Sequence, residues 1–348
     1  MNASVCEAMA SNWGSREKRF IDLTGDLRHR LVDIIHGEKT HVAVPLQGSG
    51  THILEATIGT LITENHKLLV LVNGDYGRRM VKIAQRLGKA YSFLEWSGDQ
   101  AVDPVSLASA LEKDSSISHV ALVHCETTTG VLNPLEEVAR VTKAKGRELI
   151  LDAMSSFGAL EIDVRKIPVL AVLASGNKCL EGPPGVAFAL IERHCLEHAE
   201  NVSCSLSLDL YEQWRYFEST GQWRFTPPVQ VVAGLVEALR QLENEGGPSA
   251  RLARYEALKT EISEGLQSAH CRHYLAADLI VPIIVTFIPP EVSAEHLQEF
   301  YACLEAEGLV IYAGKVQGED SFRVGCMGAI TSSDVGRLCA AFRDFFGS

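Results

Sequence analysis

Two side chains capable of covalent or acid–base chemistry follow buried apolar runs. Asp152 closes the run ELILD, and Lys178 follows the run PVLAVLAS at 168–175. A carboxylate at the end of a buried strand needs a cationic or N–H partner, and a lysine amine there can act as a nucleophile or carry protons. Each also has an ordinary interpretation, because Asp152 could cap a turn and Lys178 could extend its ammonium group into solvent.

A third feature is the turn Gly48-Ser49-Gly50-Thr51, which lies between a short apolar segment and a predicted helix. Free N–H groups at a helix N-terminus bind anions, and Ser49 and Thr51 add hydroxyl donors. The turn lacks the G-K-S/T ending of a Walker loop and does not match G-x-G-x-x-G, so neither nucleotide-binding motif is indicated. Alone, it fits an anion site or a plain strand-to-helix turn equally well.

Together the three features fit one cofactor, pyridoxal 5′-phosphate. Its aldehyde needs a lysine amine, its pyridine nitrogen needs an acidic partner, and its phosphate needs anchoring amides. Lys178, Asp152 and the turn at 48–51 provide one group of each kind. The sequence therefore predicts a pyridoxal-phosphate site built from these residues.

The elements around these residues alternate between strands and helices. Near-continuous apolar runs at 67–74, 118–126, 148–156 and 168–175 predict strands, with helices at 77–88, 103–114 and 133–146 between them. We expect Asn133 to cap the last of these helices, Pro134 to open it and Gly146 to end it. Strands that are apolar throughout are buried on both faces, which predicts an α/β fold with a mainly parallel central sheet covered by helices. Ligands of such sheets bind beyond the carboxyl ends of the strands.

The C-terminal third has a different order of elements. A helix at 229–245 leads into the break ENEGGPSA. The predicted elements that follow are a helix at 250–268, strands at 279–287, 309–314 and 322–325, a helix at 293–307 and a last helix from 332. This order predicts a smaller C-terminal α+β domain. We therefore divide the chain into a large cofactor-binding domain at 14–245 and a small domain at 246–348, and expect residues 1–13 to pack with the small domain.

Composition excludes several classes of protein. The 348 residues carry a net charge of −12 with 46% hydrophobic and 22% charged residues, which disfavours nucleic-acid or membrane-surface binding. Nine scattered cysteines without a C-x-x-C pair predict reduced thiols and a cytoplasmic location. The N-terminus has no signal-peptide core, and no apolar run is long enough for a transmembrane helix. His36, His41 and His52 have no convincing ligand spacing, so no metal site is predicted.

Seven stretches of the chain resemble the class V, fold-type I aminotransferases, and the likeness runs from about Trp13 to the end. The stretches are VPLQGSGT, NGDYGRR, HCETTTGVLNPLEEVA, LDAMSSFGAL, SGNKCLEGPPG, TGQWRFTPP and FRVGCMG. Within that class, the sequences of residues 220–228 and 322–328 are similar to those of the 2-aminoethylphosphonate–pyruvate transaminases. Members usually open with a T-P-G-P segment over the substrate site. This sequence begins just after that point, through a misassigned start, a truncation or a real loss.

The resemblance implies a role for each of nine residues. Lys178 resembles the Schiff-base lysine, and Asp152 resembles the partner of the pyridine nitrogen. Ser49, Gly50 and Thr51 resemble the phosphate-binding turn, and Tyr76, at the end of the second strand, resembles the residue that stacks on the cofactor ring. Thr128 resembles the residue whose hydroxyl lies near the cofactor's 3-oxygen. Thr226 resembles the residue that contacts the neighbouring subunit's phosphate, and Arg323 resembles the residue that binds the substrate acid group. The role of Thr226 implies a homodimer with shared active sites.

The activity implied by the resemblance is transamination of 2-aminoethylphosphonate with pyruvate, giving phosphonoacetaldehyde and L-alanine in phosphonate degradation. Three alternatives stay open at this point. The chain could be another class V aminotransferase acting on alanine, serine or glyoxylate. It could use the same residues for lyase or desulfurase chemistry, although no cysteine lies on an obvious mobile loop. It could also bind the cofactor without turnover.

Overall fold

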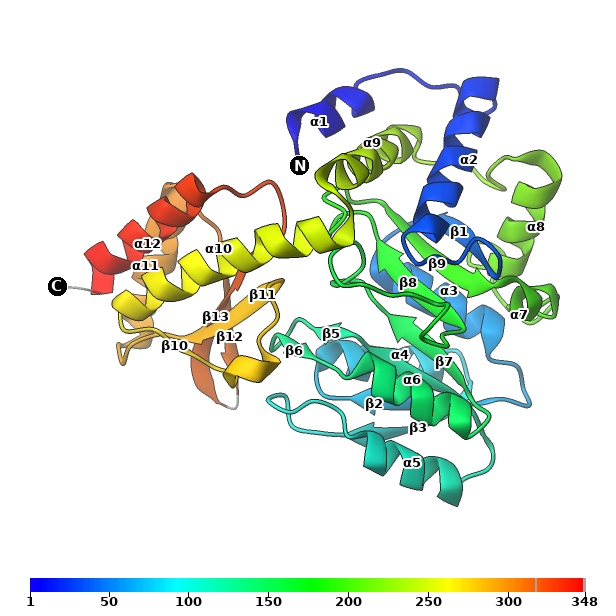
Figure 1. Cartoon of the computed structure of the whole chain (residues 1–348), viewed down its shortest axis with the longest axis horizontal. Helices are drawn as coiled ribbons and strands as arrows, with labels where there is room; N and C mark the ends of the chain where they lie inside the picture. Colours follow the sequence, from blue (N-terminus) through cyan, green and yellow to red (C-terminus); the bar gives the residue numbers. More distant parts are fainter. Residues whose placement is uncertain (317, 347–348) are drawn as a thin grey trace.

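The computed structural model describes residues 1–316 and 318–346. The chain forms two parts, one built on a seven-stranded sheet and the other on a four-stranded sheet (Figure 1). Helix α10 (Pro248–Ser268) runs from the first part to the second. Across the described ranges, no helix combines the length and apolar character needed to cross a membrane.

The seven-stranded sheet has one antiparallel strand. In spatial order its strands are β1 (His41–Gln47), β9 (Val186–Glu192), β8 (Ala171–Ser175), β7 (Glu148–Asp152), β4 (Ile117–Val123), β2 (Lys67–Val72) and β3 (Ala90–Glu95). β9 runs antiparallel to both neighbours, and the pairs from β8 to β3 are parallel. Because β1 also opposes β9, it points the same way as β8. The predicted α/β fold with a mainly parallel central sheet is confirmed.

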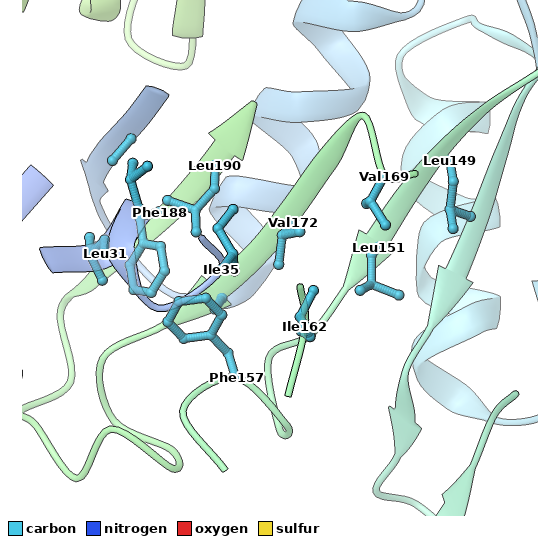
Figure 2. Packing of buried hydrophobic residues seen from close by; sticks show 14 of the residues in the cluster. Leu31, Ile35, Leu149, Leu151, Phe157, Ile162, Val169, Val172, Phe188 and Leu190 are labelled. Atoms are coloured by element: carbon cyan, nitrogen blue, oxygen red, sulfur yellow. The ribbon is translucent and has the colours of Figure 1, made fainter. Parts of the chain in front are cut away.

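The strands are apolar along their length because helices bury both faces of the sheet. In β7, Leu149 and Leu151 belong to one core and Ile150 to the other. Figure 2 shows the first core, where Leu149 and Leu151 lie with Val172 of the neighbouring strand. Helices on this side are α2 (Lys18–Asp33), α5 (Pro104–Lys113), α6 (Leu135–Ala144) and α9 (Val229–Glu245). Helices on the other side are α3 (Gly50–Leu61), α4 (Asp75–Arg86), α7 (Arg193–Glu197) and α8 (Leu210–Thr220).

The predicted start of helix 133–146 is wrong. α6 begins at Leu135, with Pro134 in the capping position, and Asn133 does not cap it. Instead, the buried Asn133 amide donates to Val123 O at 2.8 Å and accepts from Asn73 Nδ2 at 2.9 Å. Its side chain therefore joins the ends of β4 and β2, contacts that the local sequence does not specify. The end at Gly146 is confirmed by its left-handed φ of 66° just after the last helical turn.

The C-terminal part has its own antiparallel sheet and core. Its strands, in order, are β10 (Arg272–His273), β11 (Ile284–Ile288), β13 (Glu319–Gly325) and β12 (Tyr312–Val316), and its further helices are α11 (Ala294–Ala306) and α12 (Ser332–Phe346). The predicted strand at 279–287 is shorter than expected. A 3₁₀ turn at Ala277–Leu279 precedes it, and Pro282 has no N–H for a strand ladder.

The first helix does not lie on the C-terminal part. α1 (Ala3–Met9) packs on α9, where Gln241 Nε2 donates to Ser4 Oγ at 2.6 Å. A Cβ added at Gly234 would lie 2.7 Å from Met9 Cγ, so the absence of a side chain there lets the two helices approach. The expected contact of residues 1–13 with the small domain is therefore corrected. The division at 245/246 stays a prediction, and Gly246, with φ of 109°, separates α9 from α10.

Candidate active site

A cavity of about 430 Å³ opens between the two parts of the chain. Its walls include Lys178 and Tyr76 from the first part and Arg323 and Tyr312 from the second. A larger cavity of about 580 Å³ lies along α6, but it shares no lining residue with the smaller one and is lined largely by charged side chains of both signs. The smaller cavity is thus the one that joins predicted site residues.

The large sheet brings the predicted residues to one edge. Asp152 ends β7 and Lys178 follows β8, whereas Tyr76 follows β2 and Thr128 follows β4. The turn at 48–51 follows β1, which points the same way as these strands. Parallel strands present their carboxyl ends together, so side chains distant in sequence meet at this edge.

Asp152 is buried, with 2% of its surface exposed. Its Oδ1 accepts a hydrogen bond from Met154 N at 3.0 Å, while Oδ2 has no hydrogen-bond partner within the described residues. Burial raises the pKa of Asp152 to about 7, and the Met154 N–H, Arg79 and Lys178 act in the opposite direction. A buried carboxylate oxygen without a partner requires a donor. The pyridine N–H of pyridoxal phosphate is a group of the required kind.

Lys178 lies half-buried in the turn after β8, against the cavity. Its ammonium group makes no hydrogen bond or ion pair with any residue in the described part of the chain. The turn is held instead through its backbone, where Glu181 N donates to Lys178 O at 2.9 Å. The amine is consequently free to react with a ligand in the cavity.

The turn at 48–51 meets the segment that follows Asp152. A Cβ added at Gly50 would lie 2.7 Å from Met154 Sδ, so the N-terminus of α3 lies directly against this segment. Thr51 Oγ1 accepts a hydrogen bond from Arg79 Nη1 at 3.2 Å. The Arg79 cation thus lies at the N-terminus of α3, an arrangement that suits a phosphate and supports the anion-site interpretation of this turn.

Sequence reasoning missed Arg79. Its guanidinium group lies 4.7 Å from the centroid of the Tyr76 ring and hydrogen-bonds Thr51, so it links the ring to the N-terminus of α3. Arg78, one residue earlier, pairs with Glu95 at 2.6 Å instead. The spacing of Tyr76 and Arg79 by one helical turn in NGDYGRR was the available signal.

Glu126 was missed as well. Its buried carboxylate accepts from Tyr76 N at 3.2 Å, from Gly77 N at 3.4 Å and from Thr128 Oγ1 at 2.6 Å. It thus caps α4 from fifty residues away, so α4 starts at Asp75 and takes in Tyr76, which was expected to end a strand. A Cβ added at Gly74 would lie 2.3 Å from Glu126 Cδ, which explains glycine there.

Arg323, on β13, lines the same cavity as Lys178. Its Nη1 donates to Thr127 O at 2.8 Å, and its guanidinium lies 5.7 Å from the centroid of the Tyr312 ring. Thr226, by contrast, is exposed on the loop before α9 and does not line the cavity of its own chain. The structure therefore brings together all the predicted residues except Thr226.

Two cysteines near the cavity are packing residues. Cys125 and Cys179 are buried in the core that extends into the C-terminal part. Burial raises the pKa of Cys179 to about 12 and raises that of Cys125 further, so both thiols stay protonated. Neither is suited to nucleophilic chemistry.

One possible group of metal ligands, formed by His36, Glu161 and Asp163, lies apart from this cavity. The Asp163 carboxylate already pairs with Arg165 at 2.8 Å and with Lys166 at 3.2 Å. Ion pairing therefore accounts for the buried Asp163 carboxylate of this group.

Comparisons with known proteins show which proteins this chain is similar to. The family model described as aminotransferase class-V matches residues 4–336. A relative from Pseudomonas putida named 2-aminoethylphosphonate–pyruvate transaminase is 47% identical over 324 residues, covering 93% of this chain and 88% of that protein. A relative from Polaromonas sp., named 2-aminoethylphosphonate–pyruvate transaminase 1, is 47% identical and covers 97% of this chain and 91% of that protein.

Solved structures with this fold are more distant in sequence. An alanine–glyoxylate aminotransferase from Nostoc sp. has a TM-score of 0.91 at 24% identity, covering 99% of this chain and 92% of that one. A ureidoglycine–glyoxylate aminotransferase from Bacillus subtilis has a TM-score of 0.89 at 21% identity, covering 100% of this chain and 91% of that one. At these levels of sequence identity, the structural similarity shows the fold alone. The predicted fold type I is confirmed.

Proposed function

The chain belongs to the class V aminotransferase family, and on that premise we propose that it transfers the amino group of 2-aminoethylphosphonate to pyruvate. The products are phosphonoacetaldehyde and L-alanine, as in phosphonate degradation. The observation that carries the proposal is the cavity with Lys178 on one wall and Arg323 on the other. A small substrate with an amine at one end and an acid group at the other would place its amine near Lys178 and its acid group near Arg323. The names of the relatives support the choice of this substrate over others of the class.

The residues present fit pyridoxal 5′-phosphate. When bound, this cofactor supplies an aldehyde and an electron-accepting ring that stabilises negative charge on the carbon bearing the amine. Asp152 Oδ2 would accept the pyridine N–H, because this buried oxygen lacks a hydrogen-bond partner among the described residues. The N-terminus of α3, from Ser49 to Thr51, would hold the phosphate beside Arg79. Tyr76 would stack on the ring, with its backbone held by Glu126.

Lys178 has two tasks in this scheme. Its amine would hold the cofactor at the aldehyde carbon, and as a free amine it would be the base that takes a proton from the substrate carbon bearing the nitrogen. Its free ammonium group and the neighbouring cavity support both tasks. Arg323 holds the phosphonate in the first half-reaction and the carboxylate of pyruvate in the second, because its planar guanidinium suits both anions.

The proposed enzyme is a homodimer with shared sites. Thr226 is exposed on a loop that also carries Phe225, which is 48% exposed. Arg224 Nη1 of the same loop donates to the backbone carbonyl of Leu206, itself 71% exposed, at 2.9 Å. These apolar side chains suit a subunit contact through which Thr226 would reach the partner's phosphate. Nine free cysteines support a reducing compartment such as the cytoplasm.

Replacing Arg323 by lysine should raise the KM for 2-aminoethylphosphonate by roughly 10- to 100-fold, because lysine cannot bind an acid group through two parallel hydrogen bonds. The visible absorbance of the bound cofactor should not change. Steady-state kinetics with each substrate varied in turn would measure the effect. Arg272→Lys, an exposed arginine on the same sheet paired with Glu319, serves as the control. An unchanged KM in Arg323→Lys would remove Arg323 from substrate binding.

The proposed function is tested by titrating the purified holoenzyme with 2-aminoethylphosphonate while following its visible absorbance. The visible band should fall as the amino group moves to the cofactor, and pyruvate should restore it. Alanine and serine, run as competing donors, would distinguish this activity from that of other class V aminotransferases. A band that responds to alanine or serine and not to 2-aminoethylphosphonate would refute the assigned substrate. A band that no donor changes would favour a binding protein without turnover.

A further inference from the structure

A cluster of two carboxylates and two guanidinium groups lies beside the turn that carries Lys178. Arg251, whose side chain is 2% exposed, donates to Glu245 at 2.6 Å and to Cys179 O at 2.6 Å. Arg254 donates to Glu245 at 2.8 Å and to Glu181 at 2.8 Å. The cluster thus joins the Lys178 turn to the start of α10, the helix that leads into the C-terminal part.

Glu181 accepts hydrogen bonds from a guanidinium group, a hydroxyl group and a backbone amide. Its Oε1 accepts from Arg254 Nη2 at 2.8 Å, from Tyr255 OH at 2.6 Å and from Gly328 N at 3.2 Å. Its own backbone N donates to Lys178 O. Glu181 has a left-handed φ of 61°, which a residue with a side chain adopts when its surroundings enforce it. One carboxylate therefore ties the Lys178 turn to a loop of the C-terminal part.

The peptide of Gly328 is held from both sides. Its N–H donates to Glu181, and its carbonyl accepts from Arg254 Nη1 at 3.1 Å. The preceding Met327 lines the same cavity as Lys178 and Arg323, and Arg323 lies on β13, five residues before Gly328. We call this arrangement of Glu181, Arg254 and the Gly328 peptide the Glu181 clamp. It fixes the wall that carries Lys178 relative to the wall that carries Arg323.

A second set of hydrogen bonds also joins the two parts of the chain near the cavity. Arg323 Nη1 donates to Thr127 O, and Thr286 Oγ1 donates to Thr129 O at 2.8 Å. These bonds join the C-terminal sheet to the 127–130 loop and do not involve the Lys178 turn. Within the described residues, the Glu181 clamp is the hydrogen-bonded link that connects the Lys178 turn directly to the loop after β13.

We propose that Glu181 is a positioning residue that sets the separation between the Lys178 amine and the Arg323 guanidinium, and thereby selects substrates by the distance between their amine and acid groups. The inference rests on the proposed function for its substrate. A loosened clamp would let the two walls shift, so the enzyme would lose its preference for the two-carbon donor over a longer one. Cofactor attachment would persist, because among the described residues the Glu181 side chain hydrogen-bonds Arg254, Tyr255 and Gly328 only, and the bond from Glu181 to Lys178 joins backbone atoms.

The test compares Glu181→Ala with Glu245→Ala in the full-length holoenzyme. Glu245 binds both arginines of the cluster but hydrogen-bonds neither Gly328 nor the Lys178 turn, so it controls for loss of ion pairing. The ratio of kcat/KM for 2-aminoethylphosphonate to that for 3-aminopropylphosphonate is the main readout. We expect Glu181→Ala to lower this ratio by about tenfold, the effect of one lost hydrogen bond to a charged group. Glu245→Ala should leave the ratio within about twofold of wild type.

Amide hydrogen exchange in the cofactor-free chain provides a readout independent of activity. Glu181→Ala should speed exchange at the Gly328 amide, and Glu245→Ala should not. Glu181→Gln should restore most of the protection and selectivity, since its amide oxygen can still accept from Arg254, Tyr255 and Gly328. If Glu181→Ala does not fold, Glu181→Gln replaces it in the test. Its kcat/KM ratio and its Gly328 exchange rate should then change in the same direction by a smaller amount.

The positioning role would be overturned if the kcat/KM ratio changed equally in both alanine variants, or if it did not change in Glu181→Ala. If wild type fails to turn over 2-aminoethylphosphonate, the proposed function fails instead. The exchange rate at Gly328 then still decides whether the clamp exists.

Discussion

Replacing Lys178 by alanine should abolish transamination, with a loss on the order of 10⁴-fold in kcat. In the proposed function, the variant would lose both the amine that attaches the cofactor and the base that moves the substrate proton. The visible absorbance of the lysine-bound cofactor should disappear, and added 2-aminoethylphosphonate should cause no spectral change. Absorbance spectra and single-turnover assays would measure both effects.

The fold of this variant should be intact, because the Lys178 ammonium makes no hydrogen bond or ion pair within the described residues. Thermal denaturation of the cofactor-free variant should therefore match wild type closely. Lys166→Ala is the matched control, since Lys166 is an exposed lysine paired with Asp163 away from the cavity. It should keep full activity. A visible band that persists in Lys178→Ala would show that another residue carries the cofactor.

Replacing Asp152 by asparagine should lower kcat by about 10²- to 10³-fold, the usual loss when a charge aimed at the reacting group is removed. Asparagine is neutral and cannot hold the cofactor's ring nitrogen in its protonated form. The variant should still bind the cofactor through Lys178 and the α3 turn, so its visible band should remain, although its spectrum should be shifted. Rapid-mixing kinetics of each half-reaction would locate the loss.

The same substitution should stabilise the cofactor-free protein, in a pH-dependent manner. Burial raises the Asp152 pKa from 3.8 to about 7. Between these pH values the folded chain binds more protons than the unfolded chain, so the contribution of Asp152 to stability falls as pH rises through the window. At pH 8 Asp152→Asn should gain about 3 to 4 kcal/mol, and at pH 4 or below almost nothing. Denaturant unfolding at both pH values would measure the difference.

Asp163 is a control because its contribution to stability should depend on pH in the opposite direction. It is also buried, but hydrogen bonds from Arg165 hold its pKa well below the usual range for an aspartate. Its contribution to stability is present near neutral pH and is lost as pH falls. Asp163→Asn should therefore destabilise the protein at pH 8. If Asp152→Asn behaves in the same way as Asp163→Asn, then Asp152 has a partner in the folded chain and its proposed role fails.

Much of the fold followed from local sequence. Helix α9 was predicted over its observed length, and four of the central strands were found because residues such as Leu149, Ile150 and Leu151 are apolar in succession. That pattern arises only where helices cover both faces of a sheet. Asp152 and Lys178 were singled out by the same reasoning, because a charged group directly after such a run cannot reach bulk water easily.

Residues that act through distant partners escaped sequence reasoning. Glu126 caps a helix fifty residues before it, Asn133 bridges two strand ends, and Glu181 binds Gly328 across the cavity. Nothing in the neighbouring sequence distinguishes these side chains from surface or capping residues. The burial that makes their hydrogen bonds necessary exists only once the chain has folded.

The sequence by itself predicted the chemistry that we propose for this protein, because the lysine, the aspartate and the turn at 48–51 are local features at strand ends. It also determined the α/β order that places those ends at one edge. The tertiary structure alone decided which side chains support them and how far Lys178 stands from Arg323. That separation depends on the contact between two parts of the chain whose facing residues, such as Glu181 and Gly328, are far apart in sequence. Local propensities do not encode such a contact, since it forms only when both cores are in place.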